Sequence, residues 1–145
     1  MLKDDLKVLL ASTFSFYLKA ANFHWNVEGT DFPQYHEFLG NLYAEVYGSI
    51  DPIAEYIRTL DSYAPGSLTR FQELTFIQDQ IKIPRAELMF EELESDNVKY
   101  IEFLNRCFSS AESENQQGIA NFIAERLDAH NKHGWQLRSI IKRHR

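Results

Sequence analysis

The sequence has a single cysteine, Cys107, among its 145 residues, so no disulfide can form within one chain. Such scarcity is typical of proteins from a reducing compartment. No apolar run approaches the roughly 18 residues that a membrane span needs, and the opening segment 1–5 lacks the form of a secretory signal. We therefore expect a cytoplasmic protein that has no membrane partner.

Positive charge is also in short supply. Lys and Arg total 15 against 21 Asp and Glu, which gives a formal net charge of −6. Nonspecific attraction to the phosphates of nucleic acid is therefore not expected. The basic end formed by Lys142, Arg143 and Arg145 is the main exception, because several copies could act together. We expect DNA binding to be weak and salt-sensitive, or absent.

Strands are not expected, because no stretch of useful length alternates apolar and polar residues. Apolar residues recur instead at intervals of three and four, which is typical of amphipathic helices. The length fits a single domain covering residues 1–145. The pattern predicts an all-α protein with long helices at about 3–27, 31–60, 85–108 and 115–142, and a short helical piece near 68–76 within the crossover 61–84.

The second predicted helix, 31–60, carries both a start signal and a bend signal. Asp31, Pro33 and Gln34 supply an N-cap, an early proline and a capping-box glutamine. Pro52 lies inside the helix and has no N–H to donate, and its ring presses on the carbonyl of Gly48, four residues back. We expect one long helix that bends at this proline.

The first predicted helix is apolar nearly all round. Leu9, Ala11, Phe16 and Leu18 lie outside its main apolar stripe. A helix of this kind is buried on more than one side, which a small isolated bundle cannot easily provide. We therefore expect a homo-oligomer in which a second copy covers part of this helix.

Four residues in the first two predicted helices form a candidate metal-ligand set: His24, His36, Asp51 and Glu55. Asp51 and Glu55 are four residues apart, so they lie on one helix face and can offer carboxylate oxygens to one cation. Imidazole with carboxylate suits iron, zinc or manganese better than calcium, which prefers oxygen ligands alone. Singly, the histidines would be ordinary core or surface residues and the acids a solvated face. Their joint spacing favours a metal site.

The chain contains no Glu-x-x-His motif, which is the usual ligand source of a di-iron site inside a helical bundle. It also lacks the His-Glu-x-x-His motif of zinc proteases. The candidate ligands come from the first two helices alone, and the end of the first helix need not face Asp51 and Glu55 of its own chain. A site shared between two chains resolves this difficulty.

Several segments carry a family resemblance: Asn-Phe-His-Trp-Asn-Val-Glu-Gly at 22–29, Asp-Pro-Ile-Ala-Glu at 51–55 and His-Asn-Lys-His-Gly-Trp-Gln-Leu-Arg at 130–138, together with Phe32 and the pair His36-Glu37. They resemble the Dps family of ferritin-like proteins over nearly the whole chain. The resemblance implies a ferritin-like four-helix bundle with a short helix in the crossover between the second and third helices.

The resemblance also implies a hollow dodecamer built from two-fold dimers. Family members oxidise ferrous iron with hydrogen peroxide or oxygen, store the ferric product inside the shell and often shield DNA. By this resemblance, His24 and His36 of one chain face Asp51 and Glu55 of a neighbour as catalytic and metal-binding residues. The expected metal is iron, with zinc or manganese as substitutes, and the expected role is protection against oxidative damage.

The family places a carboxylate four residues after the second histidine, where this chain has Gly40. We expect Gly40 to leave one metal position weak, so that each site holds one well-occupied ion and oxidises iron slowly. The glycine could instead provide space for a water or a neighbouring aromatic ring. The alternative function is a Dps-shaped shell or DNA-protecting assembly with a weak or inactive ferroxidase site.

Two further groups of side chains keep two interpretations each. Trp25, Tyr43 and Tyr47 are interpreted as packing residues, although the tyrosines lie on the candidate-ligand face and could take up an oxidising equivalent. His130 and His133 are one helical turn apart and could bind a metal. Hydrogen bonding within the last helix is the favoured interpretation of these histidines.

Overall fold

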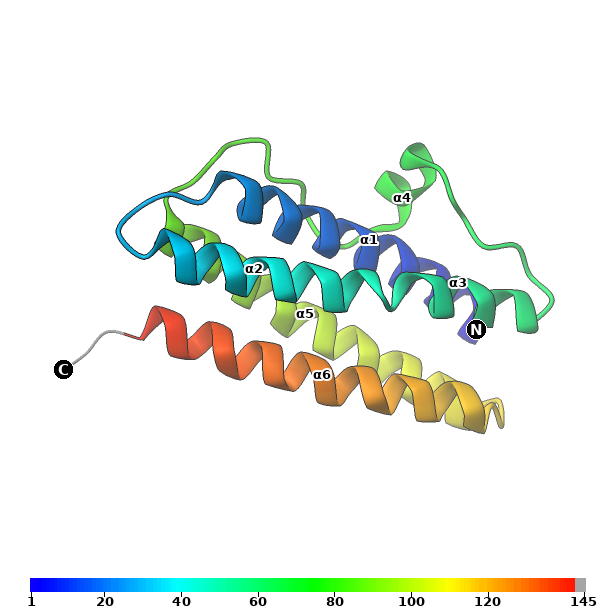
Figure 1. The fold of residues 1–145 in the computed structure, drawn as a ribbon. Coiled ribbons are helices and arrows are strands. Elements are labelled where there is room, and N and C mark those ends of the chain that lie inside the picture. The colour runs from blue at the N-terminus through cyan, green and yellow to red at the C-terminus, as the bar shows by residue number, and fades with distance from the viewer. Residues whose placement is uncertain (143–145) are drawn as a thin grey trace.

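The computed structural model describes residues 1–142, which form six helices and contain no strand (Figure 1). The helices are α1 (Leu2–Asn26), α2 (Phe32–Tyr47), α3 (Ile50–Thr59), α4 (Leu68–Leu74), α5 (Ala86–Ser113) and α6 (Gln117–Ile141). Figure 1 shows α2 and α3 almost in line beside α1, while α5 and α6 lie side by side in the other layer. The predicted four-helix bundle with a short crossover helix is confirmed.

The crossover from α3 to α5 runs along the bundle and places α4 against α1 (Figure 1). The rings of Phe14 on α1 and Phe71 on α4 have centroids 5.0 Å apart. After α4, the backbone N–H of Phe76 donates to the hydroxyl oxygen of Ser12 at 3.2 Å. The crossover therefore covers a face of α1 that the four-helix bundle alone would leave open.

Most apolar residues of α1 are buried within the single chain. Leu9, Ala11 and Phe16 are fully buried within a single chain, and Leu18 alone of the four residues outside the main stripe is exposed, at 39%. The argument that a second copy must cover this helix is therefore wrong, because the other bundle helices and the crossover of the same chain supply the cover. The case for an oligomer depends on the metal-ligand geometry.

The second predicted helix is interrupted rather than only bent. The helix breaks at Gly48 and Ser49, between α2 and α3, three to four residues before Pro52. Because Pro52 has no N–H, the carbonyl of Gly48 lacks its usual helical donor. The Ser49 hydroxyl donates to the carbonyl of Val46 at 2.7 Å, and this local bond competes with the helical ladder. The predicted position of the disturbance was thus within one turn of the observed break.

The predicted capping box at the start of this helix does not form. Asp31 is the N-cap of α2 and Pro33 lies in the first turn, as predicted, but the Asp31 side chain makes no capping hydrogen bond. The backbone N–H of Tyr35 instead donates to the carbonyl of Asp31 at 3.0 Å. The start of α2 is therefore set by backbone bonds and by the fixed φ of the proline.

The end of α5 lies five residues beyond the predicted end at residue 108. Two of the serines in this stretch have hydroxyl partners that are compatible with the helix: Ser110 donates to the Asp5 carboxylate at 2.8 Å and Ser113 to the carbonyl of Ser110 at 3.0 Å. The turn comes at Asn115, whose φ of 59° is left-handed, and Gln116 N–H closes it on a carbonyl of the preceding turn.

The bundle core consists of two apolar clusters with a polar layer between them. One cluster joins the first half of α1 to α3, the second half of α5 and the first half of α6. The other joins the second half of α1 to α2, the first half of α5 and the end of α6. None of the helices in residues 1–142 is long and apolar enough to cross a membrane. The polar layer consists of Glu45, Asn97, Arg126, His130 and His133.

Candidate metal centre

The two candidate histidines lie against each other at one end of the bundle. His24 is in the last turn of α1 and His36 is near the start of α2. The connection reverses the chain direction through Gly29, whose φ of 120° is a conformation that L side chains rarely adopt. The imidazole rings stack with centroids 3.8 Å apart and planes inclined by 16°. The predicted association of His24 with His36 is therefore present within one chain.

Reciprocal hydrogen bonds hold the imidazole pair. Nδ1 of His24 lies 2.6 Å from the carbonyl oxygen of His36, and Nδ1 of His36 lies 2.8 Å from the carbonyl oxygen of His24. A carbonyl only accepts, so each Nδ1 carries a proton, and the tautomer selected by these bonds has its lone pair on Nε2. A backbone carbonyl bonded to one ring nitrogen is the usual support for a histidine that binds metal through the other.

Gly40 lies directly against the ring of His24. A Cβ built on Gly40 would be 2.9 Å from Cε1 and 3.1 Å from Nδ1 of His24. Contacts this short would force the ring to move, and the ring is fixed by both its stack and its hydrogen bond. Of the two alternatives for this position, the structure favours space for a neighbouring ring. A carboxylate at position 40 would therefore not simply add a ligand to the existing pair.

The candidate carboxylates lie on α3, far from the imidazoles. Asp51 is in the first turn and Glu55 is one turn later, and both side chains are exposed. Neither carboxylate group forms a hydrogen bond or ion pair within residues 1–142. Arg58, three residues after Glu55, forms no ion pair with it and donates to the carbonyl of Ser62 at 3.0 Å.

The separation of the two pairs follows from helix geometry. Positions 36 and 51 are fifteen residues apart on nearly collinear helices (Figure 1), which corresponds to about 22 Å at 1.5 Å per residue. A metal ion bound by His36 at about 2 Å cannot also reach Asp51 of the same chain. Each chain therefore presents the candidate ligands as two separate half-sets, the imidazole pair and the carboxylate pair.

A group of tyrosines lies between these half-sets. The ring of Tyr43 has its centroid 5.3 Å from that of His24, and Tyr17 lies 5.9 Å from Tyr43 and 4.9 Å from Tyr47. Tyr47 is 57% exposed in the single chain, and Trp25, next to His24, is 62% exposed. The packing interpretation of Tyr43 is thus confirmed, whereas Trp25 lies largely on the surface of the single chain.

The polar layer of the core contains a second cluster of potential ligands, from Glu45 on α2 and His130 and His133 on α6. Their ligand atoms all lie within 4.8 Å of one another. Nε2 of His133 donates to Oε1 of Glu45 at 2.7 Å. Arg126 makes two bonds to the same carboxylate, at 2.5 and 2.9 Å. The predicted hydrogen bonds of the two histidines within the last helix are therefore only part of the network, whose main partners lie on other helices.

His130 is held from the opposite side by Asn97 on α5. The Asn97 amide donates to the carbonyl of His130 at 2.9 Å, so its oxygen faces Nδ1 of His130, which donates at 2.8 Å. Burial lowers the pKa of His130 well below its usual range, and the charge of Arg126 acts in the same direction. Burial alone would raise the pKa of Glu45, but hydrogen bonds from His133 and Arg126 outweigh it and hold that pKa well below its usual range.

Sequence reasoning identified the two histidines of this cluster but not Glu45 or Arg126. The spacing of four and three residues that joins Arg126, His130 and His133 on one face of α6 was an available signal. The sequence carried less signal for Glu45, which precedes the core position Val46 and resembles an ordinary surface acid. In the structure its side chain is 39% exposed.

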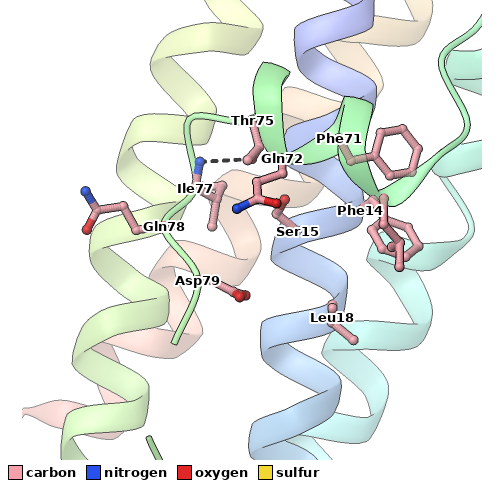
Figure 2. Close-up of a pocket in the computed structure, with 10 residues that line it drawn as sticks. Phe14, Ser15, Leu18, Phe71, Gln72, Thr75, Ile77, Gln78 and Asp79 are labelled. Carbon is pink, nitrogen blue, oxygen red and sulfur yellow. Dashed lines mark hydrogen bonds between the residues drawn. The ribbon is translucent and has the colours of Figure 1, made fainter. Parts of the chain in front are cut away.

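A separate cavity of about 650 Å³ lies between α1 and the crossover (Figure 2). Phe14 and Leu18 from α1 and Phe71 from α4 line it, together with polar side chains of the crossover such as Gln78 and Asp79. Figure 2 shows the segment after α4 passing over this space. None of the four candidate ligands lies in its wall.

Comparison with known proteins agrees with the observed fold. The family model of the ferritin-like domain matches residues 3–145. The chain is 31% identical over 135 residues to an uncharacterized low temperature-induced protein of Nostoc, which covers 92% of this chain and 75% of the relative. It is 27% identical over 125 residues to DNA protection during starvation protein 2 of Bacillus anthracis, covering 86% of each chain. Ferritin-like proteins are therefore the class to which this fold and sequence belong.

Solved structures narrow the class. The crystal structure of Dps from Staphylococcus aureus is 26% identical and superposes with a TM-score of 0.95, covering 99% of this chain and 96% of the other. A Dps protein from Bacillus brevis is also 26% identical, with a TM-score of 0.93 over 97% and 95% of the two chains. The chain belongs to the Dps family.

Proposed function

We propose that this protein oxidises ferrous iron at sites formed between two copies of the chain, with hydrogen peroxide or oxygen as oxidant, and stores the ferric product. Membership of the Dps family supports iron binding in general terms. The observation that carries the proposal is the His24–His36 pair, in which both Nε2 atoms are free to bind a metal. Withdrawal of ferrous iron from reaction with peroxide in solution would limit oxidative damage.

A two-fold dimer supplies the missing ligands. The half-sets are about 22 Å apart along α2 and α3. A partner that packs antiparallel against these helices brings its carboxylates to the imidazole pair of the first chain, and its own imidazole pair meets the carboxylates of the first chain. Symmetry then creates two identical sites, each with His24 and His36 from one chain and Asp51 and Glu55 from the partner. The exposed ring of Tyr47 lies on the face that this partner would cover. The proposed dimer is the unit from which we expect a dodecamer to assemble.

The four side chains have separate parts in the chemistry. The carboxylates of Asp51 and Glu55 offset the positive charge of bound iron and favour the ferric product, whose charge is higher. The neutral imidazoles complete the shell without adding charge. Reduction of one peroxide to two waters takes two electrons and two protons, so two ferrous ions are consumed. Since Gly40 adds no ligand, we expect one well-occupied ion per site and a slow oxidation, with zinc or manganese able to occupy the same position.

Complementation between two inactive variants tests the shared site. A His24→Ala/His36→Ala chain lacks one half-set, and an Asp51→Ala/Glu55→Ala chain lacks the other. Each variant alone should lose peroxide-driven oxidation of ferrous iron. When the two are unfolded, mixed equally and refolded, half the dimers should be mixed and carry one intact site of two, which gives about a quarter of the wild-type rate.

The control for this experiment is the histidine variant refolded with itself. A mixture that stays as inactive as this control, although light scattering shows normal assembly, would contradict the shared site. A monomer at micromolar concentration would contradict both the assembly and the site. Iron oxidation by the unmixed carboxylate variant at the wild-type rate would contradict the ligand assignment.

The second candidate function is a Dps-type shell that protects DNA and has a weak iron site. Gly40 in the place of a family carboxylate favours it, and relatives bear the name DNA protection during starvation protein. The acidic net charge of −6 argues against strong DNA binding. Of the predicted basic end, Lys142 caps α6, while Arg143 and Arg145 lie outside the described residues. We expect a gel shift at physiological salt to show weak duplex binding or none, and tight binding would favour this second function.

A further inference from the structure

We propose that Arg126 determines where this protein can bind metal, because its guanidinium occupies the cation position of a ligand cluster inside the bundle. The cluster is made by Glu45, His130 and His133, and it is separate from the imidazole pair His24–His36. Removal of the Arg126 side chain would convert the cluster into a divalent metal site within a single chain.

The donor set is one that a divalent transition metal accepts. One carboxylate and two imidazoles are the ligands of zinc sites that keep a fourth position for water. Their ligand atoms lie within 4.8 Å of one another, and a tetrahedral site needs them about 3.3 Å apart, so small rotations of the side chains would suffice. His130 already presents a bare Nε2, since its Nδ1 donates to Asn97, and that amide would act as the outer support of a metal ligand.

Arg126 uses the atoms that a metal would need. Its Nη1 and Nη2 donate to both oxygens of Glu45, and Nη2 lies 3.1 Å from Nε2 of His130. The guanidinium thus lies between the carboxylate and the imidazole lone pair, where a bound ion would be. A second cation beside this buried charge would be repelled. The cluster is consequently closed to metal in the chain as it is.

Burial of Arg126 is energetically unfavourable, because it removes a charged group and an unpaired donor from water. Arg126 is 93% buried, since its relative exposure is 7%, and its Nε has no hydrogen-bond partner among the described residues. A buried donor without a partner is unfavourable, and such groups are rare in native proteins. Compensation comes from the two-pronged bond to Glu45, which a guanidinium makes and an ammonium cannot.

The cluster is also open to exchange with solvent on one side. The Glu45 side chain is 39% exposed, although those of Arg126 and His133 are nearly buried. An ion could therefore reach the carboxylate without unfolding of the bundle. Burial of the cluster thus does not keep metal ions out, and in our proposal the charge of Arg126 does. Confinement of iron to the sites between chains is the consequence, and only that consequence depends on the function proposed above.

The test measures metal binding where the proposed site between chains is absent. In an Asp51→Asn/Glu55→Gln background, the chain with Arg126 is compared with the chain carrying Arg126→Met, which removes the charge and keeps an apolar stem. Titration with Co²⁺ alone should show about one ion more per chain in the Arg126→Met variant, with the visible absorption of cobalt bound to nitrogen and oxygen ligands. Addition of His130→Ala to that variant should abolish the extra ion.

Arg126→Lys is the matched control, since it keeps the positive charge, and it should bind no extra cobalt. Should Arg126→Met fail to fold by circular dichroism, the proposal predicts that Co²⁺ or Zn²⁺ restores folding, because the ion replaces the guanidinium. The proposal is overturned if the folded Arg126→Met variant binds no extra ion, or if metal does not restore the unfolded one. It is also overturned if the chain with Arg126 already binds an ion that His130→Ala removes. All of these outcomes are independent of iron oxidation.

Discussion

The ring of His24 lies so close to Gly40 that any side chain at position 40 would collide with it, at 2.9 Å from the first added carbon to Cε1. Gly40 is thus part of the support of the imidazole pair. Because a Cβ at this position would displace the ring, the glycine preserves the stack of His24 on His36.

Gly40→Ala is expected to weaken metal binding by roughly 10- to 100-fold, the range seen when support of a metal ligand is lost. Gly40→Asp should do the same, because its Cβ meets the same ring. Calorimetric titration with Zn²⁺ measures the effect. Gly118→Ala is the control, since Gly118 is also helical and nothing lies within 4 Å of the position of its Cβ. A Gly40→Asp variant that binds a second ion more tightly than wild type would show that Gly40 is a lost ligand.

Lys19→Met is expected to destabilise the fold by about 3–5 kcal/mol, because it leaves a buried carboxylate without its partner. Nζ of Lys19 on α1 lies 2.7 Å from Asp96 on α5, and both side chains are more than nine-tenths buried. Burial raises the pKa of Asp96, while the hydrogen bond from Lys19 opposes that rise. Urea unfolding measures the loss. Lys132→Met, which breaks an exposed pair, should change the free energy of unfolding by less than about 1 kcal/mol.

The polar layer of the core should make the protein sensitive to acid. The pKa of Glu45 is lower in the folded chain than its usual 4.5, so the stability it contributes is present above pH 4.5 and is lost as the pH falls below it. The pKa of His130 is also lowered, from 6.5, so the unfolded chain takes up a proton first and stability falls as the pH drops below 6.5. Both groups act in the same direction.

Unfolding free energies measured from pH 8 to pH 4 should therefore be nearly constant above pH 7 and fall below 6.5. Glu45→Gln should be less stable than wild type at neutral pH and show a shallower decline near pH 4.5. Equal slopes in the two proteins over that range would mean that Glu45 does not carry the lowered pKa.

Cys107 is expected to be unreactive in the folded protein. The residue is fully buried and burial raises the pKa of its thiol to about 12, so the thiolate that reacts with disulfide reagents is scarce at pH 8. Reaction with a chromogenic disulfide should be slow in buffer and rapid in denaturant, with one thiol released per chain. A rapid reaction without denaturant would show that α5 opens locally around this residue.

Short-range spacing was enough to predict the helical fold and to name the candidate ligands. The periods of three and four predicted the helices to within a few residues, apart from the end of α5 and the break at Gly48 and Ser49. The bond of Ser110 to Asp5, which joins residues 105 positions apart, accompanies the longer α5, whereas the break follows from Pro52 and the local bond of Ser49 to Val46. The Dps assignment, carried by His24, His36, Asp51 and Glu55 among others, was confirmed by the comparisons, whereas the part of each residue in iron chemistry stays a prediction.

Contacts between side chains far apart in the sequence depend on how the helices pack in the folded chain. The contact of Gly40 with the ring of His24 joins two helices, and its closeness depends on how those helices pack. Arg126 reaches Glu45 across 81 positions and His133 reaches it across 88, and no local pattern encodes such distances. A sequence specifies which faces are apolar, but the register in which the faces pack sets the partner of each buried charge. Sequence spacing predicted the pair His24–His36, but it did not predict the cluster in which Arg126 contacts Glu45 and His130.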